Sequence, residues 1–249
     1  MKAIIMAAGI GSRLKKRLGS QPKCCTEVGG ETLIGRLLRL LREKGIRDIV
    51  LVLGYEGEQL RRQLGASPDL RCYLNPFYPI TNSISSLWFA REELDGNDDA
   101  MILNGDLFFE PRLLDEAMAS EGEVVMLADP RRVEEADYRF GYEQGLLRRF
   151  GKNLTPGETT GEYVGIAKLE RSAIPGFRAR LQAMVEGQQQ HGLWWEDVLY
   201  GLCREGMPVR VAEVVDCFWA ELDYIEDYDR IQEFLRRSAT AAAMGASAA

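Results

Sequence analysis

The apolar residues of this chain form two alternating patterns, short unbroken runs and longer stretches with helical spacing. The unbroken runs, which indicate buried strands, occupy residues 3–8, 49–53, 101–103 and 124–128. The helical stretches, in which apolar residues recur every three or four positions, occupy residues 33–44, 58–64, 84–94 and 224–236. Because strands and helices alternate through the first half, the pattern predicts an α/β fold with a parallel sheet and right-handed crossovers.

The second half of the chain is less regular, and its pattern is that of strands more than of helices. Residues 140–150 predict a hairpin that turns at Gly145, and residues 161–168 predict a further strand. Residues 217–223 alternate between apolar and polar positions and end in an acid. We therefore expect these segments to extend the sheet beyond its parallel part.

The composition is that of an ordinary globular protein with an acidic surface. Of the 249 residues, 46% are hydrophobic and 28% are charged, which excludes a disordered or fibrous chain. No repeat or linker divides the sequence, so we expect one domain over residues 1–237 and a flexible alanine- and glycine-rich tail over 238–249. The formal net charge of −7 argues against nucleic acid and anionic membranes as partners.

Cysteine and histidine usage narrows the chemistry and the compartment. Five cysteines without a Cys-x-x-Cys spacing, together with no apolar export segment, predict reduced thiols in the cytoplasm and no membrane anchor. The single histidine, His191, lies beside glutamines and a glycine and is expected in a surface loop. Catalytic triads that use histidine and histidine–zinc centres are therefore poorly supported.

A glycine-containing basic segment follows the first apolar run. Open α/β sheets bind ligands at the carboxyl ends of their strands, and there Gly9 and Gly11 let backbone N–H groups approach a phosphate. Arg13 adds a planar charged fork, and Lys23, which follows a proline, adds a point charge. An ordinary tight turn would explain the glycines alone. A dinucleotide fingerprint is disfavoured because Leu14 occupies its third glycine position.

This combination resembles the first motif of the nucleotidyltransferases that activate sugar phosphates and related phosphate esters. The residues that carry the resemblance are Ala7, Ala8, Gly9, Gly11, Arg13, Leu14, Pro22 and Lys23. The resemblance extends from Lys2 to about Arg237 and implies a Rossmann-like nucleotidyltransferase fold with a central mixed, mostly parallel sheet flanked by helices. It also implies catalytic roles for Arg13 and Lys23. The residues that it places on the nucleotide are Ala7, Ala8, Gly9, Gly11 and Ser12.

Two aspartates are implied as ligands of Mg²⁺ by the same resemblance. Asp106 follows a buried run directly after Gly105, and Asp223 ends an alternating strand just before a helix. A turn at Asp106 and a helix cap at Asp223 are the structural alternatives. Phosphate-bound Mg²⁺ usually takes only one or two protein carboxylates, so these two acids would suffice.

The loop over residues 75–83 resembles the corresponding loop of the cytidylyl-transferring branch of the family. This likeness implies contacts to a base, with CTP favoured, from Thr81, Asn82, Ser83 and Ser86. The structural alternative is that Phe77 and Tyr78 close over the core while Asn82 caps the following helix.

The acceptor is expected to bind through residues from about 130 to 222. Lys152, in a Gly-Lys-x-Leu setting like that of choline- and phosphonate-handling members, is implied to grip the acceptor phosphate. Lys168 competes for this role but is expected at the surface. Two aromatic-plus-acid clusters could form a box for a cationic headgroup, although tryptophans are also common in cores. The remaining candidate residues are Tyr163, Trp194, Glu196, Trp219 and Glu221.

The resemblance implies transfer of CMP from CTP to a small phosphate or phosphonate ester, of the phosphocholine or 2-aminoethylphosphonate type, with release of pyrophosphate. A hexose-1-phosphate acceptor with UTP, GTP or dTTP is the alternative within enzymes. It is weakened by the shortness of the chain, and the usual Arg-Leu/Met-x-Pro-Leu-Thr is not present after Gly11. A non-catalytic nucleotide-binding regulatory subunit would be expected to lack the site's Arg, Lys or Asp residues, and all are present. A homo-oligomer is compatible with the sequence.

Overall fold

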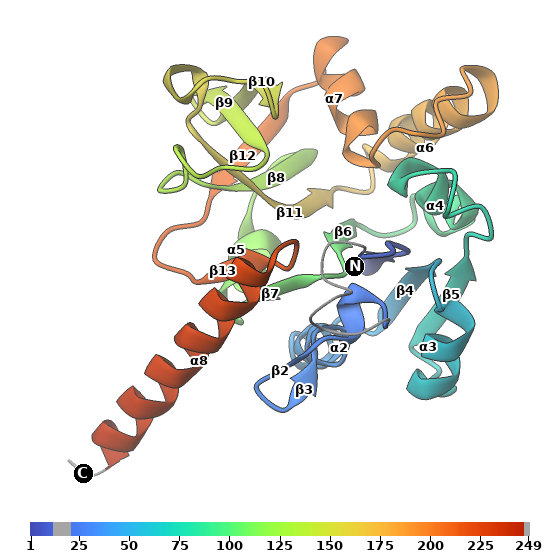
Figure 1. The fold of residues 1–249 in the computed structure, drawn as a ribbon. Coiled ribbons are helices and arrows are strands. Elements are labelled where there is room, and N and C mark those ends of the chain that lie inside the picture. The colour runs from blue at the N-terminus through green and yellow to red at the C-terminus, as the bar shows by residue number, and fades with distance from the viewer. Residues whose placement is uncertain (12–20, 247–249) are drawn as a thin grey trace.

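The computed structural model describes residues 1–11 and 21–246, and in this part of the chain the main sheet has nine strands. Its first half is a parallel ladder in the order β5-β4-β1-β6 (Figure 1). The strands of this ladder are β1 (Lys2–Ala7), β4 (Asp48–Leu53), β5 (Leu70–Leu74) and β6 (Ala100–Asn104). The apolar runs of β1, β4 and β6 are almost wholly buried, which is the reason that the sequence pattern predicted these three strands correctly, whereas the edge strand β5 is only partly buried.

The second half of the sheet is mixed and curls back on itself. The long strand β11 (Gly161–Leu169) runs antiparallel to both β6 and β8. Beyond β8 the order is β12-β10-β9, and β9 also pairs with the first residues of β11. The bounds are β8 (Val124–Asp129), β9 (Arg139–Glu143), β10 (Leu146–Gly151) and β12 (Val209–Glu213). The hairpin expected over 140–150 is thus confirmed as β9 and β10.

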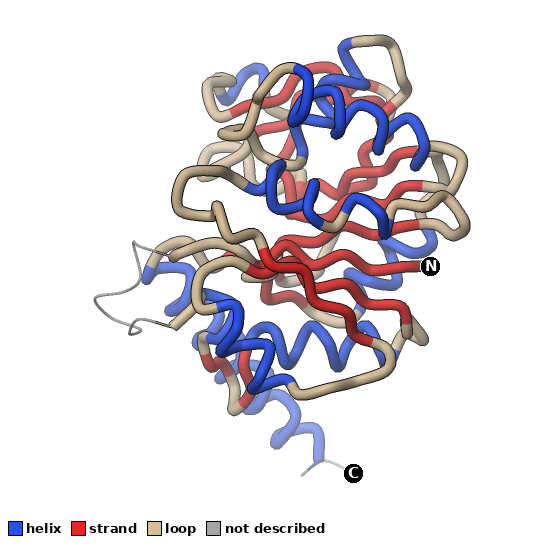
Figure 2. Tube along the Cα trace, turned by 90° about the vertical axis from the view of Figure 1, so that its right-hand side faces the viewer, coloured by secondary structure: helices blue, strands red, loops and turns tan. Residues whose placement is uncertain are grey.

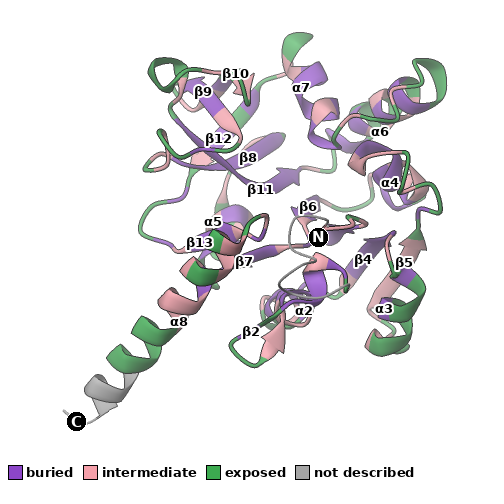
Figure 3. Ribbon diagram, viewed as in Figure 1, coloured by how far each residue is buried: buried purple, intermediate pink, exposed green. Residues whose placement is uncertain are grey.

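Helices cover both faces of the sheet (Figure 2). Because successive side chains of a strand point to opposite faces, Ile4 and Met6 of β1 join one core while Ala3 and Ile5 join the other. The first core includes α4 (Ser83–Phe89), α6 (Ile174–Gln182) and α7 (Glu196–Arg204). The second includes α2 (Leu33–Glu43), α3 (Gly57–Leu64) and α5 (Arg112–Ala119). The buried residues follow the strands and the inner sides of these helices (Figure 3).

Short elements complete the fold. The two-stranded pieces are β2 (Glu27–Val28) with β3 (Glu31–Thr32), and β7 (Leu107–Phe109) with β13 (Trp219–Glu221). Single turns of 3₁₀ helix lie at Lys23–Cys25, Arg91–Glu93 and Pro156–Glu158, and a π-helical turn at Ala183–Gly187. No helix in the described ranges is long and apolar enough to cross a membrane.

The last helix, α8 (Ile225–Ala246), packs only its first half on the body. Ile231 is fully buried there, and Phe234 stacks on Phe218 with ring centroids 4.2 Å apart. Residues 236–241 are exposed, and the helix projects away from the sheet (Figure 1). We expected a flexible tail over residues 238–249, but the chain is helical as far as Ala246. The alanines of this segment account for the helix, because alanine has the highest helix propensity of all residues.

Candidate active site

The carboxyl ends of the parallel strands open into a cavity of about 800 Å³ that lies between the two halves of the sheet. Apart from Lys168, the competing lysine, all but one of the candidate residues that the structure describes line this cavity. The exception is Ala7, which is buried against Gly105 and belongs to the core below the cavity. Ser12 and Arg13 lie outside the described residues.

The lining candidates come from segments that are far apart in the sequence. They are Ala8, Gly9, Gly11, Lys23, Thr81, Asn82, Ser83, Ser86, Asp106, Lys152, Tyr163, Trp194, Glu196, Trp219, Glu221 and Asp223. Their convergence follows from the topology, since the ends of β1, β6 and β13 meet beside the start of β11. The residues chosen from the sequence therefore lie around a single cavity.

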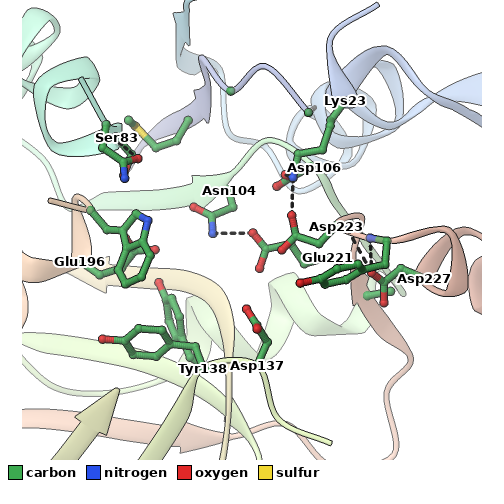
Figure 4. A pocket seen from close by; sticks show the side chains of 18 of the residues that line it. Lys23, Ser83, Asn104, Asp106, Asp137, Tyr138, Glu196, Glu221, Asp223 and Asp227 are labelled. Atoms are coloured by element: carbon green, nitrogen blue, oxygen red, sulfur yellow. Dashed lines mark hydrogen bonds and ion pairs between the residues drawn. The ribbon is translucent and has the colours of Figure 1, made fainter. Parts of the chain in front are cut away.

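Lys23 forms the centre of the charged end of the cavity. Its ammonium nitrogen lies 2.5 Å from Asp106 Oδ2 and 2.6 Å from Asp223 Oδ1 (Figure 4). Burial alone would lower the pKa of Lys23, but the charges of Asp106, Asp223 and Glu221 outweigh burial and raise it. Lys23 therefore stays protonated at neutral pH. The two aspartates, placed after β6 and β13, converge on one positive charge.

The glycine loop packs directly on Lys23. Gly11 has a φ of +64°, a region that favours glycine, and a Cβ built there would lie 2.3 Å from Lys23 Cγ. Any larger residue at Gly11 would have to displace the lysine side chain. The loop backbone therefore lies against the aliphatic stem of Lys23, whose ammonium extends to Asp106 and Asp223.

Asp223 does not act as the cap of α8. The carboxylate of Asp227 instead accepts the backbone N–H groups of Asp223 and Tyr224, at 3.1 and 2.8 Å. This leaves the Asp223 side chain directed at Lys23. Leu222 N–H donates to the backbone oxygen of Asp106 at 3.0 Å, which fixes the two acidic segments to each other.

The loop over residues 75–83 is ordered by a residue that the sequence did not single out. The buried amide of Asn75 donates to Thr81 Oγ1 and Ser86 Oγ, at 3.1 and 2.9 Å. Asn82 Oδ1 accepts from Ser83 N–H and caps α4, so the structural alternative is confirmed for Asn82. Phe77, by contrast, is 55% exposed and does not close over the core.

The two lysine candidates for the acceptor phosphate have different environments. Lys152 lines the cavity, where its ammonium lies 2.7 Å from Asp137 Oδ2 and 5.4 Å from the centre of the Trp194 ring. Lys168 was expected at the surface, and this is wrong. It is buried and donates to the backbone oxygens of Met118 and Ser120, the free carbonyls at the end of α5.

The three tryptophans of this region divide between the core and the cavity. Trp194 is 40% exposed at the cavity, whereas Trp195 is fully buried with its indole N–H donating to Asn104 Oδ1. Trp219 is also buried, and its N–H donates to Asp129 Oδ2 at 3.0 Å. Trp219 is therefore a buried part of the cavity wall. The aromatic rings that lie near Trp194 belong to other residues.

Those rings are three tyrosines, of which the sequence interpretation had chosen only one. Tyr138, Tyr163 and Tyr200 all line the cavity. Tyr138 precedes β9 and Tyr200 lies in α7, and neither position shows in the local pattern that it faces a ligand. Arg132 and Arg230 were missed for the same reason, although both line the opposite wall.

Two glutamates, the buried Glu196 and the half-buried Glu221, lie between the aromatic and the charged ends. Burial raises the pKa of Glu196 to about 8. Burial also raises the pKa of Glu221, with Asp106 and Asp223 adding to the effect. Asn104 donates to Glu221 Oε1 at 3.1 Å (Figure 4) and contacts Glu196, so one amide positions both acids. Its place directly before Gly105-Asp106 was a signal that could have identified it.

Asp106 and Asp223 fit a divalent cation. The two carboxylates already converge on one cation, the Lys23 ammonium, and carboxylate oxygens are the ligands that Mg²⁺ prefers. Within the described ranges no cluster of three or more acidic, cysteine or histidine side chains is arranged to hold an ion. Two carboxylates completed by water and phosphate are the usual set for phosphate-bound Mg²⁺.

Comparison with known proteins identifies relatives in the nucleotidyltransferase class that the sequence resembles. In Streptomyces rubellomurinus, a CMP-5'-(3-aminopropyl)phosphonate synthase is 31% identical over 237 residues, which cover 90% of this chain and 37% of that protein. The choline-phosphate cytidylyltransferase of Streptococcus pneumoniae is 39% identical over 97 residues, covering 38% of this chain and 41% of that protein. The chain thus spans about two fifths of the length of these curated relatives.

A solved structure supports the fold over the whole chain. The CTP:phosphocholine cytidylyltransferase of Streptococcus pneumoniae superposes with a TM-score of 0.76 at 22% identity, covering 94% of this chain and 98% of that one. The Rossmann-like nucleotidyltransferase fold expected from the first motif is therefore confirmed. Residues 3–237 match the family described as the MobA-like NTP transferase domain, and the chain belongs to that family.

Proposed function

We propose that this protein is a cytidylyltransferase that transfers CMP from CTP to a small phosphate or phosphonate ester with a cationic headgroup, releasing pyrophosphate. The observation that carries the proposal is the placement of Lys23 between Asp106 and Asp223 at one end of a cavity whose other end is aromatic and acidic. The two similar curated proteins, named for a CMP-phosphonate product and for choline phosphate, support this assignment.

In the proposed reaction an acceptor oxygen attacks the α-phosphorus of CTP. A bond forms between that oxygen and the phosphorus, the bond from the phosphorus to the bridging oxygen breaks, and pyrophosphate leaves. The acceptor is already an anion at neutral pH, so no general base is needed. The protein must instead hold two anions in line although they repel, by about 4 kcal/mol per charge pair a few ångströms apart at an effective dielectric near 20.

Lys23 and the glycine loop supply the positive side of this arrangement. The backbone N–H groups at Gly9 and Gly11 line the cavity beside Lys23 and would bind the phosphates of the nucleotide. We propose that Asp106 and Asp223 hold Mg²⁺, which when bound offsets the phosphate charge. Thr81, Ser83 and Ser86, with Asn82 between them, are proposed to face the base.

The far end of the cavity is proposed to hold the acceptor. Lys152 would bind its phosphate or phosphonate, and Trp194, Tyr163, Glu196 and Glu221 would surround its headgroup. A hexose 1-phosphate has no cationic group to pair with Glu196 and Glu221, which makes it the weaker candidate. A regulatory subunit without activity is disfavoured because the lysine and both aspartates converge.

The thiols support the proposed compartment. All five cysteines are free, and three of them, Cys24, Cys25 and Cys217, are buried. Free thiols are typical of proteins in a reducing environment. We therefore propose that the protein works in the cytoplasm.

The test is pyrophosphate release from each of CTP, UTP, GTP and dTTP, with MgCl₂ and a panel of phosphate and phosphonate esters. We expect release only with CTP and an ester that carries a cationic nitrogen. Asp106→Asn should reduce kcat by about 100-fold or more, because it removes charge stabilisation at the phosphates. Asp98→Asn, a change of the same chemistry at an exposed residue away from the cavity, should have no effect.

Two outcomes would contradict the proposal. Release that requires a hexose 1-phosphate would move the protein to the sugar-nucleotide enzymes. No release with any nucleotide and ester, from protein that binds CTP, would indicate the regulatory subunit.

A further inference from the structure

The tyrosine rings at the acceptor end of the cavity are packed mainly against other rings. Tyr200 stacks on Phe150 and on Tyr138, with centroids 4.2 and 5.6 Å apart. Tyr163 stacks on Phe140 at 5.1 Å. A cage for a methylated ammonium needs ring faces that are open to the cation. Stacking takes up at least one face of each of these tyrosines.

The exposed ring at this end is also engaged. Trp194 meets the edge of Tyr138 with centroids 5.7 Å apart, and the Lys152 ammonium lies 5.4 Å from the centre of its ring. A second cation over the same ring would have to displace Lys152 or lie close to it. The aromatic end of the cavity therefore offers few free faces.

What the cavity offers instead are hydrogen-bonding groups. The hydroxyl of Tyr163 is buried and has no hydrogen-bond partner among the residues that the structure describes. Two acids, Glu196 and Glu221, line the same cavity and act electrostatically on that hydroxyl, and Asn104 donates to Glu221 Oε1 at 3.1 Å. A buried polar group without a partner is rare and destabilising. At the wall of a substrate cavity, it indicates that the ligand supplies the partner.

We propose that the headgroup of the acceptor is a protonated amine that carries N–H groups, bound by Tyr163 and Glu196, and not a trimethylammonium. This inference rests on the proposed function and specifies its substrate. A primary ammonium has three N–H donors, enough for the Tyr163 hydroxyl, an oxygen of Glu196 and one further group, and its positive charge would favour loss of the proton that burial keeps on Glu196. A trimethylammonium has none, so it would cover the Tyr163 hydroxyl and leave it unpaired.

The similar proteins do not decide between these headgroups. One is named for a 3-aminopropyl phosphonate and another for choline phosphate, and they represent the two chemistries in question. The distinction therefore depends on the residues of this chain.

The test compares matched acceptors that differ only in methylation of the nitrogen. Phosphoethanolamine is compared with phosphocholine, and 2-aminoethylphosphonate with its N-trimethyl derivative, each with CTP and MgCl₂, by pyrophosphate release. We expect kcat/KM to be at least about 10-fold higher for the amine in each pair, since a site made for N–H donors rejects analogues that lack them. The difference should lie mainly in KM, because the headgroup is remote from the reacting phosphorus.

Substitution of the unpaired hydroxyl gives the second part of the test. Tyr163→Phe removes one oxygen and keeps the ring, so we expect kcat/KM to fall about 10-fold for phosphoethanolamine but not for phosphocholine, which leaves that hydroxyl unpaired in the unchanged protein. The matched control is Tyr142→Phe. Tyr142 is also a strand tyrosine, but its hydroxyl donates to Glu213 outside the cavity, so both acceptors should be unaffected.

The possible failures can be told apart. Equal kcat/KM within each pair, or a preference for the methylated acceptor, would overturn the inference and leave the proposed function in place. A Tyr163→Phe variant that loses both acceptors equally would also overturn it, because the hydroxyl would then not discriminate. Absence of pyrophosphate with all four acceptors is instead the failure of the proposed function.

Discussion

At the residue scale, Lys23 combines two roles that conflict during a catalytic cycle. In the structure its ammonium is the shared counter-ion of Asp106 and Asp223. The same cation is proposed to act on the phosphates, while the same aspartates are proposed to hold Mg²⁺. Arrival of the metal would release Lys23 from the aspartates, so the lysine stabilises the site before the metal binds.

This arrangement predicts opposite effects of Lys23→Met on turnover and on metal affinity. Turnover should fall by about 100-fold or more because a charge at the phosphates is lost. Without Mg²⁺ the variant should be less stable by about 2 kcal/mol, because two aspartates face each other without a cation. Mn²⁺, followed by electron paramagnetic resonance without nucleotide, should bind more tightly than to the unchanged protein.

A matched control for this prediction is Lys44→Met, which removes an ion pair with Asp115 on the surface. Turnover and Mn²⁺ affinity should stay the same, and the free energy of unfolding should change by no more than the contribution of a surface ion pair, about 0–1 kcal/mol. Weaker binding of Mn²⁺ to Lys23→Met would show that the lysine supports the metal site and does not compete with the metal.

Glu196 predicts a pH dependence of stability. Burial raises its pKa to about 8, and charges at Asp197 and Asp106 act in the same direction while the hydrogen bond from Asn104 opposes them. Between the ordinary pKa of 4.5 and about 8 the folded protein holds a proton at Glu196 that the unfolded chain has released. The free energy of unfolding therefore falls as the pH rises through this window, by at most about 1.4 kcal/mol per pH unit.

Denaturant unfolding at pH 6, 7 and 8 would measure this effect. Glu196→Gln cannot titrate, so the stability of the unchanged protein relative to this variant should fall by about 1–3 kcal/mol from pH 6 to pH 8. Glu143→Gln, at an exposed residue, should follow the unchanged protein at all three pH values. Parallel curves for the unchanged protein and Glu196→Gln would show that Glu196 is already ionised at pH 6.

At the scale of elements, the pattern of apolar residues predicted those strands and helices that can be identified from their own buried residues. The runs that became β1, β4, β6 and β8 are buried on both faces, so their apolar residues were contiguous and easy to identify. The helix expected over 84–94 ends earlier, at Phe89, and continues as a 3₁₀ turn. The helix α2 begins where Thr32 accepts the Gly35 N–H at 3.0 Å and caps it.

What the sequence could not supply were contacts between distant elements. Lys168 looked like a surface lysine because nothing nearby in the sequence shows that the end of α5 lies above it. Tyr138 and Tyr200 meet only because β9 closes back onto β11 beside α7. Lys23 and the two aspartates were found because their motifs, unlike these tyrosines, recur in a known family.

At the scale of the whole molecule, the site lies where the sheet changes from parallel to mixed strand pairing. The parallel half contributes the glycine loop and Asp106, which face the proposed nucleotide. The curled half contributes Tyr163 and Lys152, which face the proposed acceptor. Strand β11, antiparallel to the neighbours on both its sides, joins the two halves and so fixes the position of the two proposed binding regions relative to each other.

The same view suggests where the functional unit ends. Residues 3–237 match the family, and we propose that residues 1–237 form the complete catalytic domain. The first half of α8 belongs to this unit, because Ile231 fills a core with Phe108 and Asp227 positions the backbone at Asp223. Residues 236–241 are exposed and contribute no core.

Two truncated chains test this division. A chain that ends at Arg237 should have a free energy of unfolding within about 0.5 kcal/mol of that of the full chain, since residues 238–241, the lost residues whose burial is described, are exposed, and it should keep its kcat/KM. A chain that ends at Tyr224 retains Asp223 but loses Ile231 and Asp227, so both its stability and its turnover should fall sharply. Circular dichroism during urea unfolding and pyrophosphate release measure the two quantities. Loss of turnover in the longer chain, with stability intact, would assign the exposed half of α8 a part in the reaction and refute the boundary.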